Sequence, residues 1–259
     1  MNIEREDEHH FVYLSDEGIW LRLDKRDAIN YVSHSSSPRL TSFQSTSEAV
    51  QILSSAPVCT APFDKSSLIP IANREVLDPN THEVRARTAR DRFTFYFDVS
   101  YQLHQSSWIQ NYLNSILDSS GQTKLKRFLM ERLIGSSLHR RLILSGPPQS
   151  GKTCLKRIIE RVFHKACILV HGIENVKKYY HKHASQKCIR LVVVVPKEGE
   201  SFSRLRRCED VPVLVVDDQS EHLNAANVLL EPKFNKEKDL FHKIVSHDNV
   251  DAFFAWIVS

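Results

Sequence analysis

The chain has 259 residues, of which 41% are hydrophobic, enough for one large core or for a core with a smaller module. Its formal net charge of +4 permits a nucleic-acid partner without requiring one. The five cysteines stand singly, with no CxxC pair, which disfavours a structural zinc site and a disulfide framework. The acidic first residues and the lack of a membrane-length apolar run predict a soluble, intracellular protein with no membrane partner.

The first third of the chain contains β-prone runs separated by turn residues. Residues 11–23, FVYLSDEGIWLRL, place apolar residues on both sides of Ser-Asp-Glu-Gly, which predicts a hairpin. Residues 33–47 are rich in serine and poor in large apolar side chains, so we expect a loop or mobile linker. Residues 68–101 contain two more β-prone runs, with the turn residues Asp-Pro-Asn-Thr at 78–81 between them.

Apolar residues then recur at helical spacing in two successive segments, which predicts two amphipathic helices. The first set is Trp108, Ile109, Tyr112, Leu113, Ile116 and Leu117. The second set is Leu125, Phe128, Leu129 and Leu133, with Arg132 at the same spacing.

From residue 141 onward, short β-branched runs alternate with helical segments: LILS, CLKRIIERVF, ACILVHG, NVKKYYHKHA, IRLVVVVP and VPVLVVDD. Such alternation is typical of a parallel sheet with helices on both faces. We therefore predict an α/β fold in three parts. A smaller α+β module spans residues 1–103, a short helical bundle spans 104–140, and a parallel-sheet core with a C-terminal helix spans 141–259.

The segment GPPQSGKT, residues 146–153, matches the pattern of a phosphate-binding P-loop. An apolar strand leads into it and an amphipathic helix follows it, which is the context that brings backbone N–H groups and a helix N-terminus around an anion. The residues predicted to bind the nucleotide are Gly146, Pro147, Pro148, Gln149, Ser150, Gly151, Lys152 and Thr153. Lys152 is expected to act in catalysis on the β and γ phosphates of ATP, and the Thr153 hydroxyl to hold Mg²⁺.

A P-loop ATPase also needs an acid at the end of a neighbouring strand. The best candidates follow the run VPVLVV: Asp217 as the second ligand of Mg²⁺, and Asp218 as the group that polarises the attacking water. The run IRLVVVV ends at a proline, and the acids beyond it, Glu198 and Glu200, are weaker candidates.

The order of these segments resembles the C-terminal part of a poxvirus- or phage-type primase-helicase, a superfamily 3 helicase among the AAA+ ATPases. LIPIANREVLD leading to DRFTF is similar to that family's pre-helicase region, WIQNYLNSIL and FLMERLIG to its short helical bundle, and DAFFAWIVS to its closing helix. The resemblance implies a ring-forming ATPase, hexameric, that acts on DNA through its phosphates, single-stranded DNA above all, during viral or mobile-element replication. In a virus it would act in the host cytoplasm or nucleus.

Several features depart from the family pattern. Arg74 stands where the family has glycine, and in family order IRLVVVV is the strand that should carry the magnesium-binding acid. VPVLVVDD then falls on the next strand, where the family has an asparagine sensor, so the two placements of the acid disagree. Residues 219–235 contain no arginine that would serve as a finger toward a neighbouring subunit.

Two other functions remain open. One is a nucleotide-binding scaffold of a replication complex that keeps Lys152 and Thr153 but does not hydrolyse ATP, either as a truncated chain or as a natural short relative without the primase module. The other is a small-molecule P-loop kinase, for which Arg204, Arg206 and Arg207 are the clustered lid candidates.

Overall fold

The computed structural model describes residues 2–6, 9–36, 42–59, 61–102, 107–136, 138, 140–147, 149–184, 188–217, 227–229 and 246–259. Two compact units are present. The N-terminal unit comprises residues 1–66 and 86–95, and the C-terminal unit comprises residues 67–85 and 96–259.

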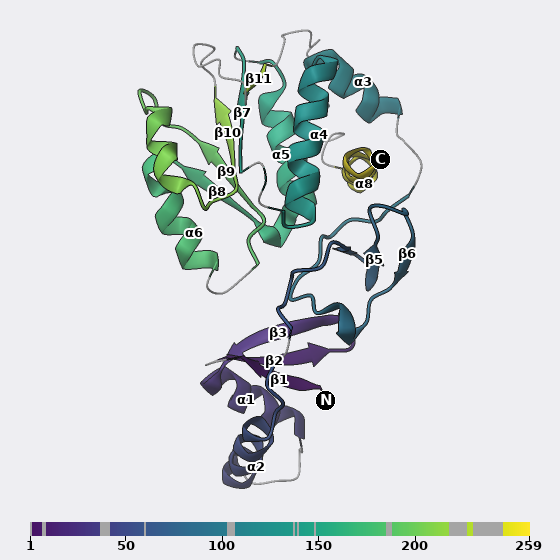
Figure 1. Cartoon of the computed structure of the whole chain (residues 1–259), viewed down its shortest axis with the longest axis vertical. Helices are drawn as coiled ribbons and strands as arrows, with labels where there is room; N and C mark the ends of the chain where they lie inside the picture. The colour runs from purple at the N-terminus through teal and green to yellow at the C-terminus, as the bar shows by residue number, and fades with distance from the viewer. Residues whose placement is uncertain are drawn as a thin grey trace. The chain divides into compact units, whose positions relative to one another are not determined.

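The N-terminal unit is a three-stranded antiparallel sheet with two helices beside it (Figure 1). The strands, in spatial order, are β1 (Ile3–Glu6), β2 (His9–Leu14) and β3 (Ile19–Asp24). The helices are α1 (Lys25–Ser36) and α2 (Ser42–Ser54). The predicted hairpin is confirmed, because β2 and β3 pair in register from His9 opposite Asp24 to Leu14 opposite Ile19.

The serine-rich segment is helical where it is described, so the prediction of a loop over residues 33–47 is wrong there. Residues 33–36 close α1 and residues 42–47 open α2. Ala28 and Val32 of α1 lie in one buried cluster with Ala49 and Leu53 of α2. Within α1, Ser35 Oγ donates to the Tyr31 carbonyl at 2.8 Å, so this hydroxyl is satisfied inside its own helix. Helix packing therefore outweighs the weak helix propensity of serine.

A small sheet and two helices form the first part of the C-terminal unit. The sheet consists of β4 (Ile69–Ile71), β5 (Glu75–Leu77) and β6 (Val84–Ala86). The first predicted run therefore forms two short strands, whereas the second is a strand only at residues 84–86. The two predicted amphipathic helices are α3 (Ser107–Ile116) and α4 (Ser119–Leu133). Asp118 caps α4 by accepting the Gly121 N–H at 2.6 Å, so this glycine lies in the first turn of the helix.

The predicted parallel sheet follows, in the spatial order β11-β7-β10-β9-β8. Its strands are β7 (Arg141–Ser145), β8 (Cys167–His171), β9 (Leu191–Val195), β10 (Val213–Asp217) and β11 (Asn227–Leu229), and the four described pairings are all parallel. The chain is therefore an α/β protein with one parallel sheet and two small antiparallel sheets.

Helices cover both faces of this sheet (Figure 1). The connections are α5 (Lys152–Phe163), η2 (His164–Ala166), η3 (Ile173–Asn175), α6 (Val176–Ala184) and η4 (Phe202–Cys208). On the α6 side, Val192 and Val194 of β9 and Val213 and Val215 of β10 form one buried cluster with Val176. Because side chains alternate along a strand, the residues between them face the opposite side, where α5 contacts β9 and β10.

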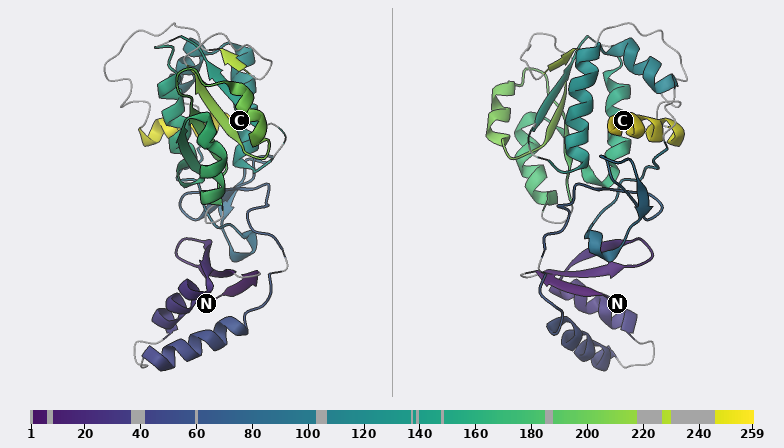
Figure 2. Two further views of the ribbon diagram at one scale, coloured as in Figure 1. Left: turned by 90° about the vertical axis from the view of Figure 1, so that its left-hand side faces the viewer. Right: turned by 45° about the vertical axis from the view of Figure 1, so that its right-hand side comes forward.

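The last helix, α8 (His247–Val258), contacts α3, α4 and α5 and is visible in yellow beside them in Figure 2. Phe253 and Phe254 are fully buried in it. Each such side chain contributes about 1.5–3 kcal/mol through burial. Asp251 accepts the Ser100 N–H at 2.8 Å, which ties the helix to the segment before α3.

Candidate functional site

The loop of residues 146–151 joins β7 to α5 in the predicted order of strand, loop and helix. Gln149 and Gly151 have φ angles of 66° and 88°. Glycine adopts this left-handed conformation at little cost, and Gly151 is the residue immediately before α5. The loop therefore turns the chain into a helix N-terminus, where unpaired backbone N–H groups favour an anion.

The ammonium of Lys152 is folded into this loop. Nζ donates hydrogen bonds to the carbonyl oxygens of Gly146 at 2.5 Å and Pro147 at 2.6 Å, and to Ser150 Oγ at 3.2 Å. The residue is only 4% exposed, so these oxygens compensate a buried charge. A phosphate oxygen is a stronger acceptor than a neutral carbonyl and would compete for the same N–H groups.

Helix α3 packs against the loop at Gly151. Tyr112 Oη donates to the Gly151 carbonyl at 3.1 Å. A Cβ atom at position 151 would lie 3.0 Å from Ile116 Cγ2, closer than most such contacts allow. Burial, with a smaller contribution from Cys154, raises the pKa of Tyr112 well above its usual value, so the phenol remains a neutral donor. Glycine at 151 is therefore required both by the turn and by the approach of α3.

Asp217 lies at the carboxyl end of β10, opposite Ser145 at the end of β7. Asp217 is 8% exposed and Ser145 is 2% exposed. Asp217 Oδ2 and Ser145 Oγ are both buried, and neither has a hydrogen-bond partner among the described residues. Buried polar atoms are normally satisfied, so this pair of unpaired oxygens suits a water molecule, a cation or a ligand hydroxyl.

The order of the strands explains why these two residues meet. The chain leaves β7 for the far edge at β8 and returns through β9 to β10, which pairs with β7. The outward connection, α5, covers one face, whereas α6 and η4 cover the other. In open α/β sheets, ligands bind at the carboxyl ends of the strands where the connections change face. The loop of residues 146–151 and Asp217 both lie at that point.

The end of β9 offers a different arrangement. Val194 pairs with Val215, and β9 is separated from β7 by β10. Glu200 Oε2 accepts the N–H groups of Ile173 at 2.8 Å and Lys197 at 2.9 Å, which closes the loop after β9 onto the end of β8. Of the acids weighed in the sequence, the one on the strand beside β7 is therefore Asp217.

The structure describes only some of the remaining predicted residues. Thr153 is exposed in the first turn of α5, beside Lys152. Asp218 and Pro148 lie outside the described residues. Cys154 is half-buried, and burial raises the pKa of its thiol, which disfavours a reactive thiolate. Ser145 was missed by sequence reasoning, although its place directly before Gly146 was a usable signal.

An arginine cluster lies at the C-terminal end of α4 and contains Arg132, Arg140 and Arg190. Gly135 has a φ angle of 71°, and a Cβ atom there would lie 1.4 Å from Nη1 of Arg190. Burial, reinforced by the charges of Arg140 and Arg190, lowers the pKa of Arg132, while Glu131 opposes the shift. Arg132 is 3% exposed and donates to the Ser136 carbonyl at 2.5 Å. Arg132 is therefore buried and hydrogen-bonded within the C-terminal unit.

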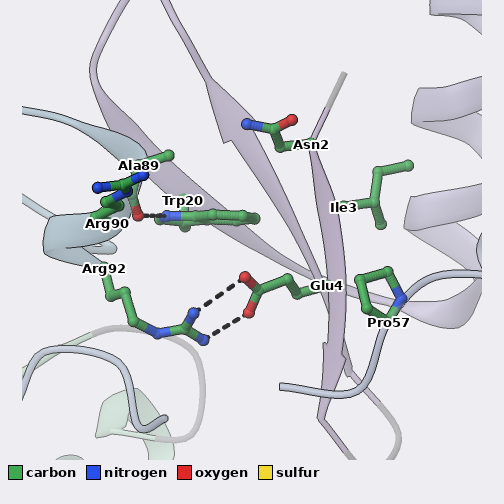
Figure 3. A pocket seen from close by; sticks show the side chains of 8 residues that line it. All are labelled: Asn2, Ile3, Glu4, Trp20, Pro57, Ala89, Arg90 and Arg92. Atoms are coloured by element: carbon green, nitrogen blue, oxygen red, sulfur yellow. Dashed lines mark hydrogen bonds and ion pairs between the residues drawn. The ribbon is translucent and has the colours of Figure 1, made fainter. Parts of the chain in front are cut away.

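A separate hollow of about 580 Å³ lies in the N-terminal unit, beside Trp20 (Figure 3). The Arg92 guanidinium holds the Glu4 carboxylate through two hydrogen bonds of 3.0 and 2.6 Å. Trp20 Nε1 donates to the Ala89 carbonyl at 2.9 Å. The polar groups of this hollow therefore bind one another and connect segments that are distant in the sequence.

Comparison with known proteins gives a likeness of fold. No protein-family model matches the chain, and no curated protein matches its sequence. A solved structure described as the A form apo structure of the NrS-1 C-terminal region is similar, with a TM-score of 0.58 and 9% sequence identity. The match covers 99% of this chain and 65% of that one. At this identity the likeness shows the fold alone.

Among the residues that the structure describes, no helix is both long and apolar enough to cross a membrane.

Proposed function

We propose that the chain is an ATP-binding and ATP-hydrolysing protein of the superfamily 3 helicase type that acts on DNA in viral or mobile-element replication. The observation that carries this proposal is the pair of unpaired buried oxygens on Asp217 and Ser145 beside the loop that holds Lys152. A carboxylate oxygen without a partner, next to a glycine-bounded loop and a helix N-terminus, fits a magnesium-bound polyphosphate.

Each group of the site would have a distinct role. Backbone N–H groups of residues 146–152 would surround the phosphates, and Lys152 would transfer its hydrogen bonds from the Gly146 and Pro147 carbonyls to phosphate oxygens. Thr153 and Asp217 are the residues that would hold Mg²⁺, directly or through water. Mg²⁺, when bound, neutralises charge on the β and γ phosphate oxygens.

Asp218 would polarise the water that attacks the γ-phosphate, beside the magnesium-bound Asp217. The Ser145 hydroxyl, opposite Asp217 at the strand ends, would fix the Asp217 carboxylate or a water bound to it. From the family resemblance, we further propose a homo-oligomer, a hexameric ring, and contacts with DNA mainly through phosphates.

A nucleotide-binding scaffold without hydrolysis is the second candidate. It is favoured by the end of β9, where the family order would place the magnesium-binding acid. Pro196 follows the strand there, and Glu200 is engaged by the backbone of Ile173 and Lys197. If that strand must supply the acid, the site binds ATP and turns it over slowly or not at all.

Titration calorimetry with ATP and Mg²⁺, followed by an ATP turnover assay with and without single-stranded DNA, tests both candidates. Lys152→Ala should weaken ATP binding at least about tenfold, or about 1.4 kcal/mol. Lys178→Ala on the exposed face of α6 removes the same charge and should leave binding unchanged. Tight binding without turnover selects the scaffold. No ATP binding by the wild-type chain, or full binding by Lys152→Ala, would rule out both.

A further inference from the structure

A basic hollow lies in the N-terminal unit, far along the chain from the 146–153 loop. It has a volume of about 600 Å³ and lies where the sheet meets α1 and α2. Arg5 of β1 and Lys25 and Arg26 of α1 line it, together with His10 of β2. Asp24 is the acid among the lining residues.

The Asp24 carboxylate is engaged by its own helix. Oδ1 accepts the Asp27 N–H at 2.8 Å and so caps the start of α1. The three cationic side chains of the hollow are all exposed and outnumber this one carboxylate among the lining residues.

The placement of Lys25 and Arg26 is unfavourable for the helix itself. They are the first two residues of α1, where the helix dipole is positive and favours acidic residues. Asp24 caps one N–H group of the first turn, and the two exposed cations concentrate positive potential beside it. Such a concentration is suited to a bound anion.

His10 is a buried polar side chain at this hollow. It is 8% exposed and lines the hollow, and its Nδ1 is buried with no hydrogen-bond partner in the described part of the chain. Its ring also hydrogen-bonds the Leu53 backbone. Burial first, and then the charges of Arg5 and Lys25, lower the pKa of His10, which reflects the positive surroundings.

The other wall of the hollow is apolar. Ile29 of α1 and Val50 and Leu53 of α2 lie there, and Val50 is 40% exposed. A hollow that is cationic on one side and apolar on the other fits a nucleotide unit, whose phosphate is anionic and whose base has an apolar face. The hollow's described lining has no phenylalanine, tyrosine or tryptophan ring for stacking, so little preference among bases is expected.

We propose that this hollow binds the phosphodiester backbone of a single-stranded nucleic acid through Arg5, Lys25 and Arg26, with the His10 ring beside them. The inference rests on the DNA partner of the proposed function, but it does not need ATP binding or hydrolysis. It assigns the contact to the N-terminal unit and leaves the 146–153 loop to the nucleotide.

Fluorescence anisotropy of a labelled oligothymidylate, measured on the full chain over a range of salt concentrations, tests the site. The double variant Lys25→Ala and Arg26→Ala should weaken binding by about an order of magnitude and reduce the slope of log Kd against log salt by about 0.7 for each lost phosphate contact. Alanine is a strong helix former, and both residues are exposed, so α1 should remain folded. Adding the oligonucleotide should also shift the His10 ring resonances in the NMR spectrum.

Lys177→Ala with Lys178→Ala on α6 is the matched control, because it removes two exposed lysines from the C-terminal unit. An unchanged affinity and salt slope in the α1 variant, with a loss in the α6 variant, would overturn the assignment. Competition by inorganic phosphate or thymidine monophosphate as effective as that of the oligonucleotide would also overturn it, by showing a site for small phosphates. Lys152→Ala should bind the oligonucleotide normally, so failure of the ATP site and failure of this site are separable.

Discussion

Asp217 and Ser145 lie opposite each other at the ends of two neighbouring parallel strands, and each has a buried oxygen without a partner in the described structure. A buried polar atom left unpaired costs about 1–3 kcal/mol. The proposed magnesium site would explain why such an arrangement persists.

Asp217→Asn should therefore lower ATP turnover without lowering the thermal stability of the protein. We expect equal or higher thermal stability, since a neutral amide is less costly to bury than a carboxylate. We expect ATP binding to lose much of its dependence on Mg²⁺, and turnover to fall at least tenfold. Differential scanning calorimetry and ATP titration with and without Mg²⁺ measure the two effects. The control is Asp210→Asn, whose side chain is 52% exposed and should affect neither. A stable variant with unaltered Mg²⁺ dependence would remove Asp217 from the metal site.

Gly151→Ala should be more damaging than Gly199→Ala. Both glycines have positive φ angles, 88° and 76°, so each substitution introduces about 1–2 kcal/mol of backbone strain. Only at position 151 does the new Cβ meet a neighbour, Ile116 Cγ2 at 3.0 Å, whereas nothing lies within 4 Å at position 199. Chemical denaturation should show the larger loss for Gly151→Ala, together with weaker ATP binding. Equal losses for the two variants would contradict the proposed close approach of α3.

Tyr112→Phe should change the stability of the protein at alkaline pH. Burial raises the pKa of Tyr112 in the folded state above its unfolded value of about 10. The folded protein then retains a proton that the unfolded chain loses, so wild-type stability should fall as the pH rises above about 10. The raised pKa values of Tyr101 and Tyr180 act in the same direction in both proteins.

The difference between wild type and Tyr112→Phe therefore isolates this residue. Near neutral pH the variant should lose about 0.5–1.5 kcal/mol with the hydrogen bond to Gly151. Above pH 10 the gap should narrow, since phenylalanine does not ionise. Urea denaturation at a series of pH values measures the difference in free energy of unfolding between the two proteins. A difference that stays constant or widens would show that Tyr112 is not the buried neutral phenol described.

Gly135→Ala should show strong coupling to Arg190. The new Cβ would occupy the place of the Arg190 guanidinium, 1.4 Å from Nη1, in addition to the strain of a φ angle of 71°. We expect a loss of about 2–4 kcal/mol in the wild-type background and about 1–2 kcal/mol in an Arg190→Ala background. A double-mutant cycle measured by denaturation gives the coupling energy directly. Simple additivity would mean that the guanidinium moves away without cost.

Local sequence patterns predicted several secondary-structure elements of this protein. The hairpin of residues 11–23, the amphipathic helices before residue 134 and the strand, loop and helix around GPPQSGKT depend on residues close together in the sequence, whose spacing and turn chemistry already determine their conformation. The same is true of Gly151, whose positive φ follows from its place before a helix. The serine-rich helices were not predictable in this way, because α1 and α2 are stabilised by packing on each other.

The sequence by itself determined a P-loop pattern and two candidate strands for the acid, but it did not determine which strand lies next to the loop. That depends on the order of strands in the sheet, where β10 pairs with β7 although about 70 residues separate them. Likewise, the basic hollow joins residues 5, 10, 25 and 26 with α2 only after the helices pack on the sheet. Parallel strand order and helix docking are set by long-range packing, so the tertiary structure alone brought Asp217 to Ser145 and a buried histidine to a cluster of cations.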